Sequence, residues 1–482
     1  MVIILFLGLF DLSVCRQTTT EIYLPKSSLS RFPANDITDI VVYGNTIWFG
    51  TSKGLISTNN DGLNFTLYTH ENGLVKGDIS TVNVSYDGTI WISTVFDSAT
   101  SIGDMEVGGG LSYSTDNGIT WNWIPQPVDA ITDTAGGKKP TTVAVTNVTW
   151  DIAFRDNDIW IASWAGGLRK STDDGKTWEV VTPDGLPFDV LGNLNHRPFS
   201  VINAQNGLWL GTAAGINKST DGGKTWTNYN AQNGSGISGN FVNCLAEQTF
   251  QGKSIIWAST WKAEDEEEDY GVSMTENGGL TWKILLVGEK PHAFAFHENE
   301  AYVVTDNGLF KTADFGKTWG NFPQIVDESG NAIFTTEMYS VAVKSNDLWV
   351  GTGDGLANTS DKGNSWKIFR AFEPTGTEKE SATYAYPNPF SPLRHNLIGG
   401  EGHVRIQYNT KNNTSVSIKI FDFGMNLVRN LVSDKSRPGG GDYYEVWDGR
   451  NENGVIVANG VYFYKLELSG EKTAWGKIVV LN

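Results

Sequence analysis

The chain has 482 residues, among them 54 glycines and 18 tryptophans, and its formal net charge is −18. This length predicts two or more domains. The acidic charge excludes nucleic acid and anionic membranes as main partners, because both require a basic surface. Abundant glycine and tryptophan are typical of many short strands that are joined by tight turns and packed through large rings.

Residues 1–16 begin with the apolar run MVIILFLGLF and are predicted to be a secretion leader, since the run is too short to span a bilayer. No later segment is apolar enough to cross a membrane. The letters LSVC at 12–15 loosely resemble a lipoprotein cleavage box, so lipidation at Cys15 stays an alternative. The second cysteine is Cys244, and neither the cysteines nor the six histidines have metal-binding spacing. The sequence therefore predicts neither a disulfide framework nor a zinc site.

One eight-residue phrase recurs seven times. The copies are TNNDGLNF at 58–65, STDNGITW at 114–121, STDDGKTW at 171–178, STDGGKTW at 219–226, TENGGLTW at 275–282, TADFGKTW at 312–319 and TSDKGNSW at 359–366. Their shared pattern is Ser or Thr, any residue, Asp or Asn, any residue, Gly, any residue, a Thr-like residue and an aromatic one. This pattern resembles the Asp-box repeat of bacterial neuraminidases, over about 310 residues of the chain.

The phrase has a physical reason as a hairpin turn. The hydroxyl and the Asp or Asn oxygens can accept hydrogen bonds from backbone amides, and the glycine tolerates positive φ. The final aromatic residue, for example Trp226, is expected to lock the turn by burying its ring. The polar third positions are therefore predicted to be structural and not catalytic. They are Asn60, Asp116, Asp173, Asp221, Asn277, Asp314 and Asp361.

A second phrase precedes most copies of the first, as in IWFGTSKGL at 47–55 and LWVGTGDGL at 348–356. An alternating stretch such as DIVVYGN at 39–45 lies upstream of it. Each unit thus predicts four antiparallel strands, and seven units predict a seven-bladed β-propeller at 36–370. Two segments, 21–24 and 366–369, both resemble an outer strand, so the strand that closes the ring stays open.

Residues 371–383 are polar and are predicted to be a linker. Short alternating runs after it predict a small β-sandwich at 384–482. The stretches YPNPF and PGGGDYYEVWDGRNENGVIVANGVYFYKLEL and the terminal KIVVLN resemble the Ig-like domain of flagellar hook-capping proteins. They are equally similar to the type A C-terminal sorting domain of type IX secretion. This resemblance implies an address read by the outer-membrane export machinery, and a passive adhesion-type Ig module is the alternative. The predicted fold is therefore all-β, a seven-bladed β-propeller followed by a small Ig-like β-sandwich.

The resemblance to Asp-box proteins raises the question of catalysis, because these propellers include sialidases. Sialidases use three arginines, a Tyr/Glu pair and an acid/base Asp, whereas residues 17–383 contain five arginines in all. Three convergent arginines are hard to assemble from so few. Xyloglucan-type endoglucanases pair two such rings, and only one ring fits this chain. Other glycosidase chemistry depends on the separation of two carboxylates, so a secreted glycoside hydrolase stays the alternative to a binding protein.

The top face of a propeller carries the loops between blades and those between second and third strands, and the boxes lie opposite. Trp164 and Trp261 stand at the upper end of the second strand, where other units have small residues such as Ser52 and Ala213. Exposed tryptophans beside polar loops suit sugar stacking or peptide capture. The starts of the innermost strands are expected to ring the channel mouth, and packing between blades is the alternative for them. These positions are Thr38, Thr81, Trp150, Phe199, Phe241, His292 and Tyr339.

Long insertions at 95–110, 125–146, 183–197 and 262–271 are expected to be loops on the same face. The acidic run at 264–269 is interpreted as a solvated loop tip, with a weak calcium site as the alternative. No other cofactor is predicted.

The sequence as a whole predicts a non-catalytic binding or scaffold protein, secreted or on the outer surface of a Gram-negative-type bacterium. Its partners are expected to be a polysaccharide, a peptide or a surface protein, besides the type IX machinery that reads 384–482. The alternative is a secreted glycoside hydrolase, sialidase- or xyloglucanase-like, that acts on polysaccharide.

Overall fold

The computed structural model describes residues 28–482 except 30, 101–102, 264–266, 372–374, 376–381 and 399. The predicted leader, Cys15 and the strand-like segment 21–24 lie outside the described residues. Strands dominate the described part, and its helical structure consists of four short 3-10 turns: η1 (His70–Asn72), η2 (Ala135–Gly137), η3 (Leu194–His196) and η4 (Ala231–Asn233). The prediction of an all-β chain is confirmed. None of the helices in this part is long and apolar enough to cross a membrane.

Seven antiparallel sheets follow one another in the described chain up to residue 369. Sheet 1 has the order β1-β5-β4-β3-β2, with β1 (Ser28–Leu29), β2 (Ile37–Tyr43), β3 (Thr46–Thr51), β4 (Gly54–Thr58) and β5 (Phe65–Tyr68). Sheet 2 has β6 (Asp78–Val84), β7 (Ile90–Thr100), β8 (Gly103–Ser114) and β9 (Asn122–Ile124). Sheet 3 has β10 (Thr149–Arg155), β11 (Asp158–Ser163), β12 (Gly167–Ser171) and β13 (Glu179–Val181).

The next four sheets have the same sequential order of strands. Sheet 4 has β14 (Pro198–Ala204), β15 (Gly207–Thr212), β16 (Gly215–Ser219) and β17 (Thr227–Tyr229). Sheet 5 has β18 (Phe241–Phe250), β19 (Lys253–Trp261), β20 (Gly271–Thr275) and β21 (Lys283–Leu285). Sheet 6 has β22 (Pro291–His297), β23 (Glu300–Thr305), β24 (Gly308–Thr312) and β25 (Gly320–Asn321). Sheet 7 has β26 (Met338–Lys344), β27 (Asp347–Thr352), β28 (Gly355–Thr359) and β29 (Lys367–Phe369).

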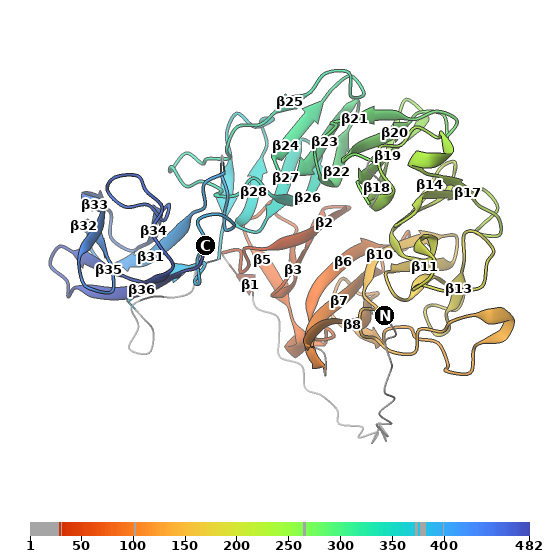
Figure 1. Cartoon of the computed structure of the whole chain (residues 1–482), viewed down its shortest axis with the longest axis horizontal. Helices are drawn as coiled ribbons and strands as arrows, with labels where there is room; N and C mark the ends of the chain where they lie inside the picture. The colour runs from red at the N-terminus through yellow and green to blue at the C-terminus, as the bar shows by residue number, and fades with distance from the viewer. Residues whose placement is uncertain are drawn as a thin grey trace.

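The sheets are arranged around a common centre (Figure 1). The first long strand of each sheet contacts that of the next sheet, and β26 of sheet 7 contacts β2 of sheet 1. The Ser340 hydroxyl donates a hydrogen bond to the Ile37 carbonyl (3.0 Å), and the rings of Trp349 and Phe49 lie 5.7 Å apart. Strand β29 pairs with β28, and β1 pairs with β5. Sheets 7 and 1 thus join through side-chain packing, while 367–369 remain the outer strand of sheet 7.

Rings from both phrases are buried in these sheets, and the box residues Phe65 and Trp366 are 1% and 7% exposed. Trp160, Trp209, Trp257 and Trp349 are fully buried, because they lie in the second strand with a neighbouring sheet against them. The box residue Trp226 is only half-buried, and its Nε1 donates a hydrogen bond to the Gly223 carbonyl (3.1 Å). In sheet 4 the second-strand residue Trp209 is therefore a larger contributor to the core than Trp226.

Each box holds its turn through its own polar side chains, as sheet 4 illustrates. The Ser219 hydroxyl donates to Asp221 Oδ1 (2.8 Å) and accepts from the Gly223 amide (2.8 Å), while Asp221 also accepts from the Thr225 amide (2.9 Å). The φ of Gly223 is +87°, and a Cβ there would lie 2.5 Å from the Trp160 ring of sheet 3. The box therefore also packs closely against the preceding sheet, which leaves no room for a side chain at this glycine.

One predicted loop is part of a hairpin. Strands β7 and β8 remain paired as far as Thr100 and Gly103, so most of 95–110 is strand. Continuous pairing satisfies the backbone groups of this insertion, and the expectation of an irregular loop there was wrong.

Two further sheets follow residue 382. One has the order β30-β31-β34, with β30 (Thr383–Tyr386), β31 (Val404–Thr410) and β34 (Gly441–Trp447). The other has the order β33-β32-β35-β36, with β32 (Thr414–Phe421), β33 (Leu427–Arg437), β35 (Gly460–Leu468) and β36 (Ala474–Val480). They share one core that includes Phe390, Trp447 and Tyr464. We call this part the C-terminal domain; it lies beside the ring, next to sheets 1 and 7 (Figure 1).

Candidate binding face

Every innermost strand of the ring has a β-bulge one or two residues after its start. At each bulge the pairing with the second strand skips one residue. The skipped residues are Thr38, Ser80, Trp150, Phe199, Asn243, His292 and Tyr339. Bulges redirect side chains and are frequent beside functional sites.

Five of these residues are the strand starts that the sequence predicts, and two are not. In sheet 2 the bulge is at Ser80, and Thr81 pairs normally with Ser93. In sheet 5 it is at Asn243, and Phe241 pairs with Trp261. The count from the second strand misplaces these two bulges because their hairpins are longer: Val84 pairs with Ile90 across a longer turn in sheet 2, and the β18–β19 pairing extends further beyond Ala246 and Trp257 in sheet 5.

Aromatic side chains form a row across the start of the innermost strands of sheets 4 to 7. The ring centroids of Phe199 and Phe241 are 4.4 Å apart, those of Phe241 and Trp261 6.0 Å, and those of Trp261 and His292 5.3 Å. His292 continues the row to Tyr339 at 5.5 Å. We call these five residues the aromatic row. Four are half-buried and Tyr339 is 36% exposed, so the row combines packing with a solvent-facing edge.

Trp261 has the most contacts in the row. Its Nε1 donates a hydrogen bond to the Pro291 carbonyl (2.8 Å) of the next sheet, and Lys290 Nζ lies 5.8 Å from its ring. The ring therefore helps to join sheets 5 and 6 while it remains partly open to solvent. Packing between sheets and ligand contact are compatible at this position.

The other two predicted tryptophans lie apart from the row. Trp164 follows β11, is half-buried, and has the Arg197 guanidinium 5.7 Å from its ring. Trp150 is the bulged residue of β10 and is also half-buried. Within the described part of the chain, neither ring has a ring–ring contact with the aromatic row. The structure thus brings together Trp261, Phe199, His292 and Tyr339 and leaves Trp164 and Trp150 on sheet 3.

Two carboxylates that were not predicted from the sequence lie beside the aromatic row. Asp306 Oδ1 is hydrogen-bonded to His292 Nε2 (2.7 Å), and this bond lowers the pKa of Asp306. The Tyr339 hydroxyl donates to Glu337 (2.8 Å), and burial together with this carboxylate raises the pKa of Tyr339. Asp306 lies at the end of its second strand, four residues after Tyr302, as Trp164 lies four residues after Trp160 and Trp261 four after Trp257. Alignment of the second phrase across the units would have found it.

Two other aspartates have perturbed pKa values for a structural reason. Burial raises the pKa of Asp39 to about 6 and that of Asp151 to about 7. Asp39 accepts a hydrogen bond from the Val82 amide (2.8 Å), and Asp151 accepts one from the Val201 amide (2.9 Å). Each carboxylate thus links its innermost strand to the next sheet.

The acidic run at 264–269 is not only a solvated tip. Glu264, Asp265 and Glu266 lie outside the described residues, but Glu268 is 4% exposed. Its carboxylate accepts hydrogen bonds from the amides of Asn240 (3.0 Å) and Ala263 (2.8 Å). Glu268 therefore holds this loop against the start of sheet 5. Among the described residues, no group of three or more His, Cys, Asp or Glu side chains is placed to hold a metal ion.

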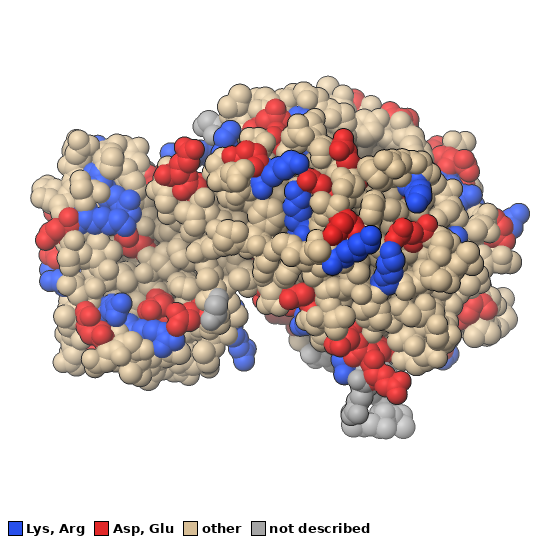
Figure 2. All heavy atoms as spheres, turned by 90° about the horizontal axis from the view of Figure 1, so that it is seen from above, with Lys and Arg blue, Asp and Glu red and all other residues tan. Residues whose placement is uncertain are grey.

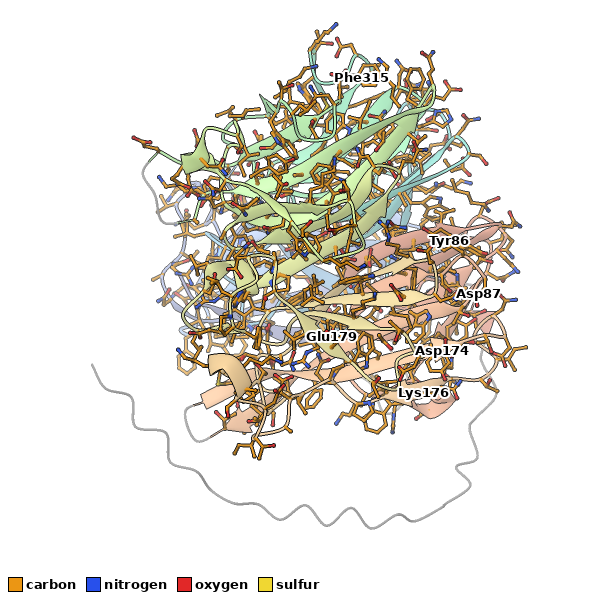
Figure 3. The ribbon with its side chains drawn as sticks, turned by 90° about the vertical axis from the view of Figure 1, so that its right-hand side faces the viewer. Tyr86, Asp87, Asp174, Lys176, Glu179 and Phe315 are labelled. Atoms are coloured by element: carbon orange, nitrogen blue, oxygen red, sulfur yellow. The ribbon has the colours of Figure 1, made fainter. Side chains whose placement is uncertain are left out.

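The boxes lie at the opposite end of the strands from the aromatic row. Asp174 and Lys176 of the sheet 3 box lie on the same side of the molecule as Tyr86 and Asp87 of the β6–β7 turn (Figure 3). Acidic and basic side chains are interspersed on the face seen from above, without one dominant patch (Figure 2). The box aspartates remain ionised; hydrogen bonds from Thr177, for example, lower the pKa of Asp173 to about 2.

No protein-family model matches the chain, and no curated protein sequence matches it. Solved structures do match its fold. An ancestral GH74 enzyme has a TM-score of 0.52 at 16% identity, over 95% of this chain and 64% of that one. The GH74 enzyme of Niastella koreensis has a TM-score of 0.51 at 12% identity, over 94% of this chain and 73% of that one.

A further match is PorZ of Porphyromonas gingivalis, a surface component of the type IX secretion system. Its TM-score is 0.46 at 16% identity, over 94% of this chain and 66% of that one. This chain therefore spans about two thirds of the length of several proteins it matches. At these identities the GH74 likeness establishes the fold alone, which is that of a β-propeller.

Proposed function

We propose that this protein is an exported, non-catalytic binding propeller with seven Asp-box blades, which are the seven sheets described above. Its ligand is an extended polymer, a polysaccharide or a peptide chain, that lies along the aromatic row. The row carries the proposal, because partly exposed rings from four consecutive sheets offer repeated stacking contacts. Asp306 and Glu337 add hydrogen-bond acceptors along the same edge.

We further propose that residues 384–482 are an Ig-like sorting domain read by the type IX export machinery. This places the mature protein outside the cell or on its outer surface. This proposal is supported by the amino-acid sequence of the segment, from YPNPF to the terminal KIVVLN, and by its two sheets, which share a single core. The proposed binding function requires no cofactor.

Hydrolysis of the polymer is the second candidate. The observation that favours it is the pair of carboxylates Asp306 and Glu337. Their hydrogen-bond partners, His292 and Tyr339, have ring centroids 5.5 Å apart. Glycoside hydrolysis needs a carboxylic acid that stays protonated near neutral pH. The pKa of Asp306 is shifted the other way by His292, so binding is the better supported function.

The test is an array of glycans and peptides probed with the full chain, run beside a hydrolysis screen on the same polysaccharides. We expect specific retention of one polymer class without turnover, and loss of retention in Trp261→Ala. Turnover that disappears in Asp306→Asn or Glu337→Gln would replace the binding proposal by the hydrolase. Retention that is unaffected by changes in the aromatic row would place the ligand elsewhere.

A further inference from the structure

A cavity of about 350 Å³ lies where the C-terminal domain meets sheets 1 and 7. Asp36, Lys53 and Arg370 line it from the ring side, and Arg405 and Gln407 of β31 line it from the C-terminal domain. This site is separate from the aromatic row, and nothing in the proposed function depends on it.

A buried ion group fixes one wall of the cavity. Asp354 lies in the β27–β28 turn, is fully buried, and accepts hydrogen bonds from Arg370 Nη2 (2.7 Å) and from Arg405 Nη1. Burial lowers the pKa of Arg405, although Asp354 acts in the opposite direction. The shared carboxylate therefore holds both guanidinium groups in place across the junction of ring and C-terminal domain.

The same wall contains hydrogen-bond donors that the protein does not use. Arg405 is 4% exposed, and among the described residues only its Nη1 has a hydrogen-bond partner. Gln407 is 3% exposed, and its Nε2 is buried without a partner in the described part of the chain. Buried donors without acceptors are unfavourable and rare, so Gln407 Nε2, beside an arginine whose other donors carry no protein partner in the described part of the chain, indicates that an occupant supplies the acceptors.

The charges around the cavity indicate what kind of acceptor fits. Lys53, Arg370, Arg405 and Asp36 line the cavity, and Asp354 pairs with the two arginines, so these five groups carry an excess of one positive charge. A single carboxylate balances this excess, whereas the Asp36 carboxylate disfavours a doubly charged anion. A carboxylate also matches the planar fork of an arginine.

An aromatic wall completes the site. Tyr386 is 47% exposed, lines the cavity, and its ring lies 6.0 Å from the Arg405 guanidinium. We propose that this cavity is a binding site for a small planar monocarboxylate. Its carboxylate accepts hydrogen bonds from Arg405 and Gln407, and its ring lies against Tyr386.

Benzoate is the probe, and benzamide is its neutral control of the same shape. Ligand-observed NMR on the full chain is expected to detect benzoate binding and much weaker benzamide binding. Gln407→Leu removes the unpaired donor without disturbing Asp354, and we expect it to fold normally and to bind benzoate about tenfold more weakly or worse. Arg405→Lys keeps a cation for Asp354 but loses the fork, and it should weaken binding similarly.

Lys472→Gln removes an exposed charge of the C-terminal domain and is the control variant, with unchanged binding expected. Circular dichroism checks that each variant is folded. Equal binding of benzoate and benzamide, no benzoate binding, or binding that survives both Gln407→Leu and Arg405→Lys would overturn the proposal.

Discussion

Replacement of single tryptophans separates ligand contact from packing in the ring. Trp164→Ala removes a half-buried ring whose described contact is the Arg197 guanidinium at 5.7 Å, which is worth about 0.5–1 kcal/mol. Trp261→Ala also removes the hydrogen bond to Pro291 and the ring contacts with Phe241 and His292. Loss of this hydrogen bond and these ring contacts is expected to lower the free energy of unfolding by about 2–4 kcal/mol. Trp209→Ala removes a fully buried ring and is expected to cost about 3–5 kcal/mol.

The loss of stability is therefore expected to be smallest for Trp164→Ala, larger for Trp261→Ala and largest for Trp209→Ala. Affinity for the polymer is expected to follow a different order. Trp261→Ala should lower it about three- to tenfold or more, because a stacking contact is worth about 0.5–1.5 kcal/mol beyond its buried area. Trp209→Ala should leave the affinity of the folded fraction unchanged. Trp261→Phe keeps a ring without the Nε1–H donor and should retain most of the binding.

Urea-induced unfolding and titration with the retained polymer measure the two quantities on the same samples. If Trp164→Ala destabilises the ring as much as Trp209→Ala does, position 164 belongs to the core and the reasoning from small residues in sister sheets fails. If Trp261→Ala unfolds the protein as Trp209→Ala does, or leaves affinity unchanged, the aromatic row is packing alone.

Three further outcomes follow from the structure. Gly223→Ala should lower the free energy of unfolding in urea by about 2–4 kcal/mol, since its Cβ would meet the Trp160 ring at a positive φ. Gly222→Ala has a positive φ but open space around its Cβ and should lower it by about 1 kcal/mol, so equal losses would contradict the packing account. The stability difference between Asp151→Asn and the native chain should shift by about 2 kcal/mol in favour of the variant between pH 5 and pH 8. The pKa of Asp151 is raised to about 7 in the fold, so the native chain loses free energy of unfolding as the pH rises toward 7, whereas the asparagine of the variant does not ionise. A stability difference independent of pH would refute this account. Removal of 384–482 should leave a folded ring, with Asp354 still paired to Arg370, in the periplasm, and its arrival in the medium would exclude the sorting role.

Local sequence patterns specified much of the ring but not its junctions. The boxes fix hairpin turns through hydrogen bonds within eight residues, as between Ser219 and Asp221, so seven copies predict seven similar sheets. The bulges at Ser80 and Asn243 were misplaced because the hairpins of sheets 2 and 5 are longer than those of the other sheets, and strand pairing decides where such a hairpin turns. Asp306 does have a local sequence signal, because it occupies the position that Trp164 and Trp261 have in their units.

The amino-acid sequence by itself determined the all-β class and the repeated sheets, since both rest on contacts between residues close in the chain. Only the tertiary structure decided which aromatic residues of each unit are fully buried, how sheet 7 meets sheet 1, and that a C-terminal domain packs against the ring. It also decided that Arg405, Asp354 and Arg370 share one buried site. These features arise from groups that are far apart in sequence, and the cost of burying a charge or a ring is fixed only when its neighbours are in place.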